Sequence, residues 1–187
     1  VGSEMCIRDR IIVGLLCVLF AFLYTTGPYP LSYNGWGDVL VIVFFGFVPV
    51  GGTYYVQALT WTSDTTVASL ICGLLIDTLL VVNNYRDREA DARSGKRTVI
   101  VRFGEKFGRY LYLMLGVAAS LLCFWFFFEG HLFAALLPLL YLIPHVLTWR
   151  RMVQIHSGKK LNSILGETSR NMLLMGILLS IGFLIRH

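Results

Sequence analysis

A cluster of acidic, amide and basic side chains follows directly on an apolar run, in residues 83–98. If a helix continues through the cluster, Asp87 and Asp91 lie four residues apart on one face, with Asn84 one turn earlier. Carboxylate and amide oxygens are ligands for Mg²⁺, which keeps several waters and is usually completed by substrate phosphates. The pattern therefore predicts a site for a metal-bound diphosphate, with Asn84, Asp87 and Asp91 as the metal ligands.

Basic side chains surround these acids. Guanidinium and ammonium groups donate hydrogen bonds to phosphate oxygens, so we expect several of them to hold the diphosphate, with the amide of Asn83 beside them. The basic residues are Arg86, Arg88, Arg93, Lys96, Arg97 and Arg102. The alternative is a solvated segment at the membrane surface, in which Glu89 and Arg93 form a surface pair of little energetic consequence.

Asp77 stands inside the apolar run, two turns before Asn84 on the same face. An ionisable side chain at membrane depth is costly, and it is therefore a candidate for a functional role. The alternative is a buried carboxyl group that hydrogen-bonds to a neighbouring helix for structural reasons.

The composition is that of an integral membrane protein. Of 187 residues, 56% are hydrophobic and 14% charged, and the mean hydropathy of +0.69 is too high for a soluble domain. The net charge of +5 is explained by basic residues beside a lipid bilayer and does not require nucleic acid. The four cysteines are scattered without metal-ligand spacing, so we expect neither a zinc site nor a disulfide framework.

Apolar runs of near-spanning length predict an all-α fold, a polytopic transmembrane bundle of about six helices. The runs cover residues 11–24, 39–59, 66–84, 107–128, 132–149 and 171–185. Lysine and arginine concentrate in residues 86–109 and 150–160, which are two helices apart, so both segments are predicted to be cytoplasmic. By the same count, the segment 27–38 lies on that side too.

Residues 1–10 are polar and supply no helix start for the apolar run that follows. The predicted topology also places Arg8 and Arg10 on the side opposite to the other basic segments. We therefore expect residues 1–10 to be a non-native leader, and residues 11–187 to be the C-terminal part of a single transmembrane domain. The alternative, a signal peptide, lacks a small-x-small cleavage site.

Several motifs follow one another along the chain. Residues 83–98 read NNYRDREADARSGKRT and are followed by VIVRFG, while earlier segments read YTTGPYPL (24–31), GWGD (35–38), FFG (44–46) and GTYYVQ (52–57). On these motifs the chain resembles the UbiA superfamily of intramembrane aromatic prenyltransferases, and most of all its 1,4-dihydroxy-2-naphthoate branch. The resemblance extends over nearly all residues after Arg10.

The resemblance implies a nine-helix fold with two aspartate-rich motifs, each cytoplasmic and each holding Mg²⁺ on a prenyl diphosphate. Residues 83–98 are similar to the second motif, and the sequence contains no N-D-x-x-D-x-x-x-D. We therefore expect an N-terminally truncated prenyltransferase with about six of the nine helices, inactive by itself. The complete enzyme is expected in the bacterial inner membrane.

For the complete enzyme, the resemblance implies transfer of a polyprenyl group from polyprenyl diphosphate to 1,4-dihydroxy-2-naphthoate. The acceptor loses CO₂, and the product is demethylmenaquinone. Asp87, Asp91 and Asn84 would hold Mg²⁺ on the diphosphate. Positive charge would stabilise the departing diphosphate, and the residues expected to supply it are Lys96, Arg97, Arg86 and Arg102.

The acceptor and the allylic cation need further groups. Asp77 or Gln57 would orient the acceptor. Aromatic faces stabilise positive charge, and the candidates are Tyr29, Tyr33, Tyr54 and Tyr55, although aromatic side chains at helix ends often only anchor the helix at the membrane interface.

Three other functions are compatible with parts of the pattern. Another branch of the same superfamily would use 4-hydroxybenzoate or haem as the acceptor. A CDP-alcohol phosphotransferase would need a D-G-x-x-A-R motif, which the sequence lacks. A membrane transporter could use Asp77 as a coupling-ion site, but it would need polar residues along several spans, whereas here they gather on one side.

Overall fold

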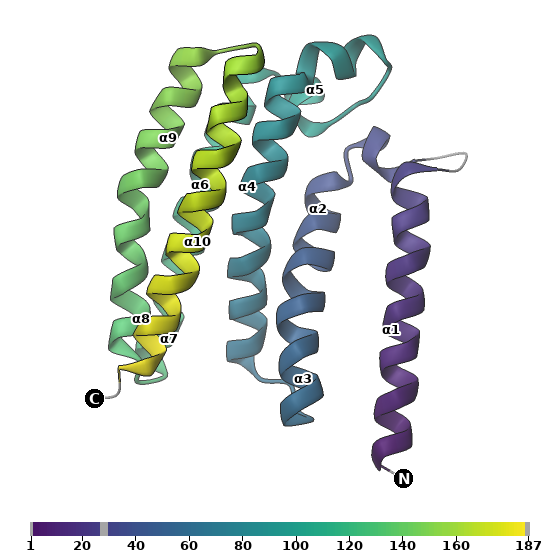
Figure 1. Cartoon of the computed structure of the whole chain (residues 1–187), viewed down its shortest axis with the longest axis vertical. Coiled ribbons are helices and arrows are strands. Elements are labelled where there is room, and N and C mark those ends of the chain that lie inside the picture. The colour runs from purple at the N-terminus through teal and green to yellow at the C-terminus, as the bar shows by residue number, and fades with distance from the viewer. Residues whose placement is uncertain (1, 27–29, 186–187) are drawn as a thin grey trace.

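In the computed structural model, which describes residues 2–26 and 30–185, every regular element is a helix (Figure 1). The all-α prediction is confirmed. In chain order the elements are α1 (Gly2–Thr25), η1 (Leu31–Asn34), α2 (Gly37–Val41), η2 (Ile42–Gly51), α3 (Gly52–Ala58), α4 (Ser63–Arg93), α5 (Val99–Phe103), α6 (Glu105–Leu122), α7 (Trp125–Phe128), α8 (Leu132–Leu136), η3 (Leu137–Tyr141), α9 (Leu142–Ile155), η4 (Lys159–Leu161) and α10 (Asn162–Leu184).

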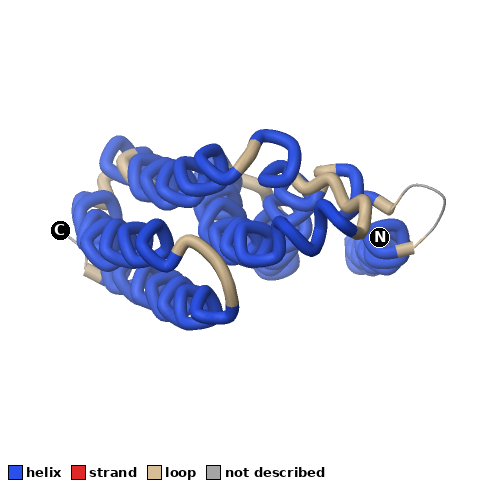
Figure 2. Tube along the Cα trace, turned by 90° about the horizontal axis from the view of Figure 1, so that it is seen from above, coloured by secondary structure: helices blue, strands red, loops and turns tan. Residues whose placement is uncertain are grey.

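Five helical stretches among the described residues are long and apolar enough to cross a membrane. They are Gly37–Ala58, Ser63–Arg93, Glu105–Phe128, Leu132–Ile155 and Lys159–Leu184. The sixth predicted span is present as the shorter apolar segment Ile11–Tyr24 within α1. The long helices run up and down beside one another (Figures 1 and 2), so the protein is an integral membrane helix bundle.

Several predicted helix bounds differ from the structure, among them the start of the last span, which was expected at Asn171 whereas α10 begins at Asn162. The third apolar run ends at Asn84, and whether its helix continues through the charged cluster was left open; α4 does continue, to Arg93, because residues 85–93 contain neither glycine nor proline. The first helix was expected to begin at Ile11, but α1 begins at Gly2, so residues 2–10 do supply a helix start. A helix needs only backbone hydrogen bonds, and a polar sequence provides them equally well.

The basic segments gather at one end of the bundle, as predicted. The C-terminal end of α4, the short helix α5, the described residues 30–38 and the connection from α9 to α10 all lie at the top of Figure 1. We call this the charged end, made of residues 30–38, 84–109 and 155–162. The opposite end carries α3, the start of α4 and α7.

The central helix is α4, which packs against η2 on one side and against α6 and α10 on the other. Helix α1 stands at the edge (Figure 2), where the rings of Phe20 and Phe44 lie 5.1 Å apart. Two clusters of buried side chains form the core around α4. The first cluster consists of Val81, Val82, Tyr85, Ile100, Tyr112, Leu115, Met152, Leu161 and Ile164. The second consists of Ile71, Leu75, Ala119, Cys123, Phe126, Ala134, Tyr141 and Met175.

Two glycines let η2 lie directly against α4. A Cβ atom at Gly46 would fall 2.5 Å from the carbonyl oxygen of Ser69 and 2.8 Å from the Cα atom of Gly73. A Cβ atom at Gly73 would in turn fall 2.9 Å from the Cα atom of Ile42. Because backbone atoms cannot move aside as the end of a side chain can, this close helix contact requires both glycines.

Gly46→Ala is expected to push η2 away from α4 and to lower the free energy of unfolding by about 1–3 kcal/mol, the usual cost of overpacking. The control is Gly52→Ala in α3, where an added Cβ atom meets nothing within 4 Å. That variant should be as stable as the parent or slightly more stable, since alanine restricts the unfolded chain. Thermal unfolding in detergent compares the two, and equal midpoints would contradict the close contact.

Candidate functional site

The end of α4 brings the charged segment back toward the bundle. Gly95 has φ +79°, which favours glycine, and it reverses the chain after Arg93. The backbone N–H of Lys96 then donates to the carbonyl of Asp91 at 2.9 Å. Two residues later, the Thr98 hydroxyl caps α5 by accepting from the N–H of Val101 at 3.3 Å. Lys96 is therefore held beside the last turns of α4.

One face of α4 carries a row of oxygen-bearing side chains. Asp77, Asn84 and Asp91 are seven residues apart, which is close to two helical turns, so they share this face. Asp77 is 1% exposed, Asn84 is 6% exposed, and the Asp91 side chain is 14% exposed. We call these three residues the oxygen row. Its burial away from bulk water fits a role in binding more closely than that of a solvated helix end.

At the outer end of the oxygen row, Asp91 lies close to a cation. Its Oδ2 atom is 3.4 Å from the Lys96 Nζ atom. This oxygen is buried and accepts no hydrogen bond from the part of the chain that the structure describes. A buried carboxylate oxygen without a hydrogen bond is costly unless a ligand or ion completes it.

Asp87 is placed differently from Asp91. Its side chain is 44% exposed, and both of its oxygens accept from the neighbouring guanidinium, Arg86 Nε at 2.7 Å and Nη2 at 2.6 Å. The same guanidinium donates through Nη1 to the Asn162 side-chain oxygen of α10 at 2.9 Å. Asp87 can therefore reach the site only if Arg86 releases it. Asn83, on the adjacent face, is exposed.

A small polar cavity lies against Asn84, the middle residue of the oxygen row, with about 10 Å³ of free space, enough for one water molecule or one hydroxyl group. Its lining joins four segments, and consists of Tyr24, Ser32, Gly35, Gly37, Asp38, Asn84, Lys96 and Thr98. Asp38 begins the second membrane span, and its buried Oδ1 atom has no hydrogen-bond partner among residues 2–26 and 30–185.

An apolar groove of about 470 Å³ runs beside the polar cavity, between α1 and the α2–η2 stretch. Tyr24 lines both the groove and the cavity. The other groove residues are Cys17, Phe20, Ala21, Leu40, Val41, Phe44 and Phe45. A hydrocarbon chain in this groove would end beside Asn84 and Lys96.

The remaining predicted cations at the charged end contact η1. Arg102 donates through Nη2 to the carbonyl of Asn34 at 2.8 Å, and the backbone N–H of Arg97 donates to the carbonyl of Tyr33 at 2.7 Å. The side chains of Arg97, Arg102 and Tyr33 are exposed. They lie near the cavity without lining it. Tyr29 lies outside the described residues.

Several predicted residues lie elsewhere. Tyr54, Tyr55 and Gln57 belong to α3, at the end of the bundle opposite to the oxygen row (Figure 1). Helical rise explains this placement, since the 16 residues from Asp38 to Tyr54 advance the chain by roughly 24 Å. These three residues therefore do not join the site that the charged end assembles.

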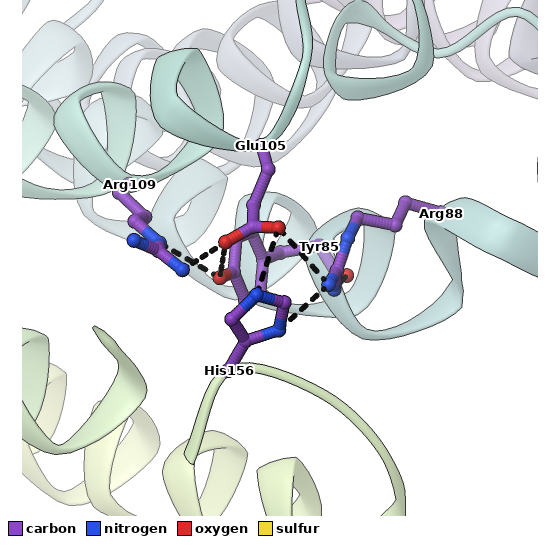
Figure 3. Close-up of polar contacts among 5 residues, drawn as sticks. All are labelled: Tyr85, Arg88, Glu105, Arg109 and His156. Carbon is purple, nitrogen blue, oxygen red and sulfur yellow. Dashed lines mark hydrogen bonds and ion pairs between the residues drawn. The ribbon is translucent and has the colours of Figure 1, made fainter. Parts of the chain in front are cut away.

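Arg88 is also turned away, into a polar network on another face of α4 (Figure 3). Glu105 is the centre of this network. It accepts from the Tyr85 hydroxyl at 3.1 Å and from Arg88 at 3.4 Å, and it pairs with Arg109 and with His156. The Arg88 guanidinium also stacks over the Tyr85 ring at 4.6 Å. The network joins α4, α6 and the end of α9, so Arg88 is not free to hold a phosphate.

Among the cavity residues that were not predicted as site residues, Asp38 and Tyr24 carry ionisable side chains. Both occur in segments that the sequence marks, GWGD and YTTGPYPL, and Asp38 is an acid at the start of an apolar run. An acid at a membrane boundary is a weak signal by itself, because it is usually solvated. Only the packing of α2 against α4 turns Asp38 toward Asn84.

Comparisons with known proteins identify the family of this chain. A model of the UbiA prenyltransferase family matches residues 10–182. The 1,4-dihydroxy-2-naphthoate octaprenyltransferase of Haemophilus influenzae is 38% identical over 181 residues, covering 92% of this chain and 56% of that protein. The proteins of the same name from Escherichia coli and Mycobacterium leprae are 40% and 44% identical, over 60% of this chain and 36% and 38% of their own lengths.

The chain thus spans about half the length, or less, of these curated relatives. No solved structure matches it.

Glu105→Ala should lower the free energy of unfolding by about 1–3 kcal/mol, because it leaves Arg88, Arg109 and the Tyr85 hydroxyl without their shared acceptor. The matched control is Glu129→Ala, which removes an exposed carboxylate from the α7–α8 turn and should change stability by less than about 0.5 kcal/mol. Thermal unfolding in detergent distinguishes the two. Equal unfolding midpoints of Glu105→Ala and Glu129→Ala would show that the network does not stabilise the fold.

Proposed function

This chain is a member of the UbiA prenyltransferase family, and on that premise we propose that the whole protein transfers a polyprenyl group from polyprenyl diphosphate to 1,4-dihydroxy-2-naphthoate. The acceptor would lose CO₂ to give demethylmenaquinone. The observation that carries the proposal is the oxygen row beside Lys96, at a point where a polar cavity meets an apolar groove. The names of the relatives favour this acceptor.

Mg²⁺ fits the donor set of the oxygen row. Asn84 and Asp91 offer hard oxygen ligands, and Asp91 has a buried oxygen without a hydrogen bond. Asp87 lies between them, one turn before Asp91. No three His, Cys, Asp or Glu side chains within the described segments could hold a metal ion together. That is typical of magnesium sites that substrate phosphates complete. The bound ion would supply charge neutralisation on the diphosphate oxygens.

Lys96 and Arg86 are the cations placed to act on the diphosphate. Lys96 lines the cavity beside Asn84, and Arg86 is paired with Asp87, one turn before Asp91, through a guanidinium fork that matches phosphate oxygens. On binding, Arg86 would exchange Asp87 for a phosphate, which frees Asp87 as a ligand. Arg97 and Arg102, exposed nearby, would add long-range attraction. Together they would stabilise negative charge on the leaving group as the allylic C–O bond breaks.

The apolar groove would take the polyprenyl chain. Its rings and aliphatic side chains exclude water from the allylic carbon, which protects a cation from premature quenching. Among the tyrosines, Tyr24 lines the groove and Tyr33 lies at the charged end, whereas Tyr54 and Tyr55 of α3 lie at the opposite end. Asp77, at the inner end of the oxygen row, would orient the acceptor.

We infer that the charged end faces the cytoplasm of a bacterium and that the bundle lies in the inner membrane. The basic residues of the charged end are the support, because lysine and arginine concentrate on the cytoplasmic side of such proteins.

Asp87→Asn and Asp91→Asn should each reduce Mg²⁺-dependent transfer by about 100-fold or more, because each removes a charged ligand of the metal-diphosphate. The assay uses a chimera in which this chain replaces the matched part of the Haemophilus influenzae relative, with labelled polyprenyl diphosphate as donor. Glu89→Gln is the control, since Glu89 is an exposed acid on the same turn of helix. Unchanged turnover in both aspartate variants would refute the metal role.

The same chimera identifies the acceptor. With 1,4-dihydroxy-2-naphthoate it should form a prenylated product and release CO₂, whereas 4-hydroxybenzoate and haem should give no product. Because each ring is offered separately with the same donor, transfer only to 4-hydroxybenzoate or only to haem would reassign the acceptor while leaving the prenyl transfer intact.

A further inference from the structure

Two carboxylates outside the proposed metal ligands lie on α2 and α4, which pack against each other. Asp38 comes from the first turn of α2, and Asp77 from the middle of α4. In both, the Oδ1 atom is buried and has no hydrogen-bond partner within the described part of the chain. Asp77 is 99% buried, since its exposure is 1%. Two such unpartnered acceptors in one place indicate a ligand that supplies hydrogen-bond donors.

The two carboxylates belong to one site. A Cβ atom at Gly37, the residue before Asp38, would fall 3.3 Å from the Cδ2 atom of Leu80, which lies three residues after Asp77 on α4. The Tyr24 hydroxyl lies against the start of α2, 3.6 Å from the position that a Cβ atom at Gly37 would take. Within the described residues, Lys96 is the cation that lines the cavity, and it is already paired with Asp91. Hydroxyl donors would therefore stabilise Asp38 and Asp77 without competition from a salt bridge.

The space available fixes the size of what can enter. The polar cavity beside Asp38 has room for a hydroxyl group but not for a ring, while the apolar groove next to it is large enough for a ring. Tyr24 lines both spaces. A hydroxylated aromatic molecule could therefore lie with its ring at the Tyr24 end of the groove and its hydroxyl groups toward the acids.

We propose that Asp38 and Asp77, with the Tyr24 hydroxyl beside them, form a subsite that accepts hydrogen bonds from the ring hydroxyl groups of the aromatic acceptor. The subsite rests on the proposed function for the identity of its ligand. Asp77 was expected to orient the acceptor, but Asp38, the pairing of the two acids and the requirement for ring hydroxyl groups are new. A bound ether would leave the buried carboxylate oxygens without hydrogen-bond donors, which is unfavourable. The subsite is therefore expected to bind hydroxylated rings more tightly than their ethers.

The subsite also places the acceptor for reaction. Asn84 and Lys96 line the same cavity as Asp38, and they are the groups proposed to bind the diphosphate. An acceptor that donates to Asp38 would lie next to the allylic carbon at the mouth of the groove. Its hydroxyl groups, hydrogen-bonded to carboxylates, would also make the ring more electron-rich and so a better nucleophile. Asp38 and Asp77 therefore act as binding and specificity residues.

The test measures binding to this chain in lipid nanodiscs, with empty nanodiscs as the reference. The two probes are 1,4-dihydroxy-2-naphthoate and its dimethyl ether, 1,4-dimethoxy-2-naphthoate, which cannot donate a hydrogen bond from the ring oxygens. The parent chain should bind the dihydroxy compound about 10-fold more tightly or better. Asp38→Asn and Asp77→Asn should bind the two compounds about equally. Tyr24→Phe, a smaller change, should lose part of the preference.

Asp64→Asn is the matched control, because Asp64 lies on α4 at the opposite end of the bundle, where it accepts from the Trp125 indole N–H at 2.8 Å. An asparagine can keep that bond, so the parent's preference should persist. Equal binding of both probes by the parent chain would overturn the subsite. So would a preference that survives in Asp38→Asn and Asp77→Asn, or one that Asp64→Asn also loses.

The transfer assay separates this subsite from the proposed function. In the chimera, Asp38→Asn should raise the KM for the acceptor by about 10-fold or more and leave the KM for the prenyl diphosphate unchanged. A normal acceptor KM would reject the subsite while prenyl transfer stands. Conversely, if the chimera transfers nothing but the chain still shows the hydroxyl preference that its aspartate variants lose, the subsite stands and the proposed function fails.

Discussion

A carboxylate at the edge of a lipid bilayer must be paired, hydrated or bound to a ligand, because hydrocarbon cannot solvate its charge. In this protein, α4 runs unbroken from the middle of the bundle to the charged end, and it carries Asp77 and Asp91 along one face. The helix fixes their spacing, with Asp77 fully buried in the bundle and Asp91 partly buried at its charged end. Between them on the same face, Asn84 lines the polar cavity together with Asp38 and Lys96.

Another face of α4, near the charged end, carries polar side chains that bind only one another and neighbouring helices. Tyr85 and Arg88 are satisfied there by Glu105, Arg109 and His156, so that face is a completed network (Figure 3). Adjacent positions on one helix thus divide between structure and binding. A network that holds α4 against α6 and α9 keeps the oxygen row in position, which is how a rigid scaffold supports a binding site.

The sequence was sufficient for the parts of the fold that repeat along a helix. Apolar runs predicted the spans, the spacing of Asn84, Asp87 and Asp91 predicted one helical face, and the basic segments predicted a common end. It was insufficient where distant segments meet. Asp38 and Tyr24 enter the site through packing between helices. The Arg86 side chain adopts a conformation in which it donates to both Asp87 oxygens, which the sequence spacing does not predict. Tyr54, Tyr55 and Gln57 matched a family motif, yet one full span separates them from the charged end.

The central claim is that the oxygen row holds a divalent ion against a diphosphate, and metal counting tests it most directly. Mn²⁺ replaces Mg²⁺, and electron paramagnetic resonance measures the ions bound by the chimera in the presence of an unreactive prenyl thiolodiphosphate. We predict that Asp91→Asn binds one ion fewer than the parent. An unchanged number of bound ions, with the analogue still held, would contradict the claim.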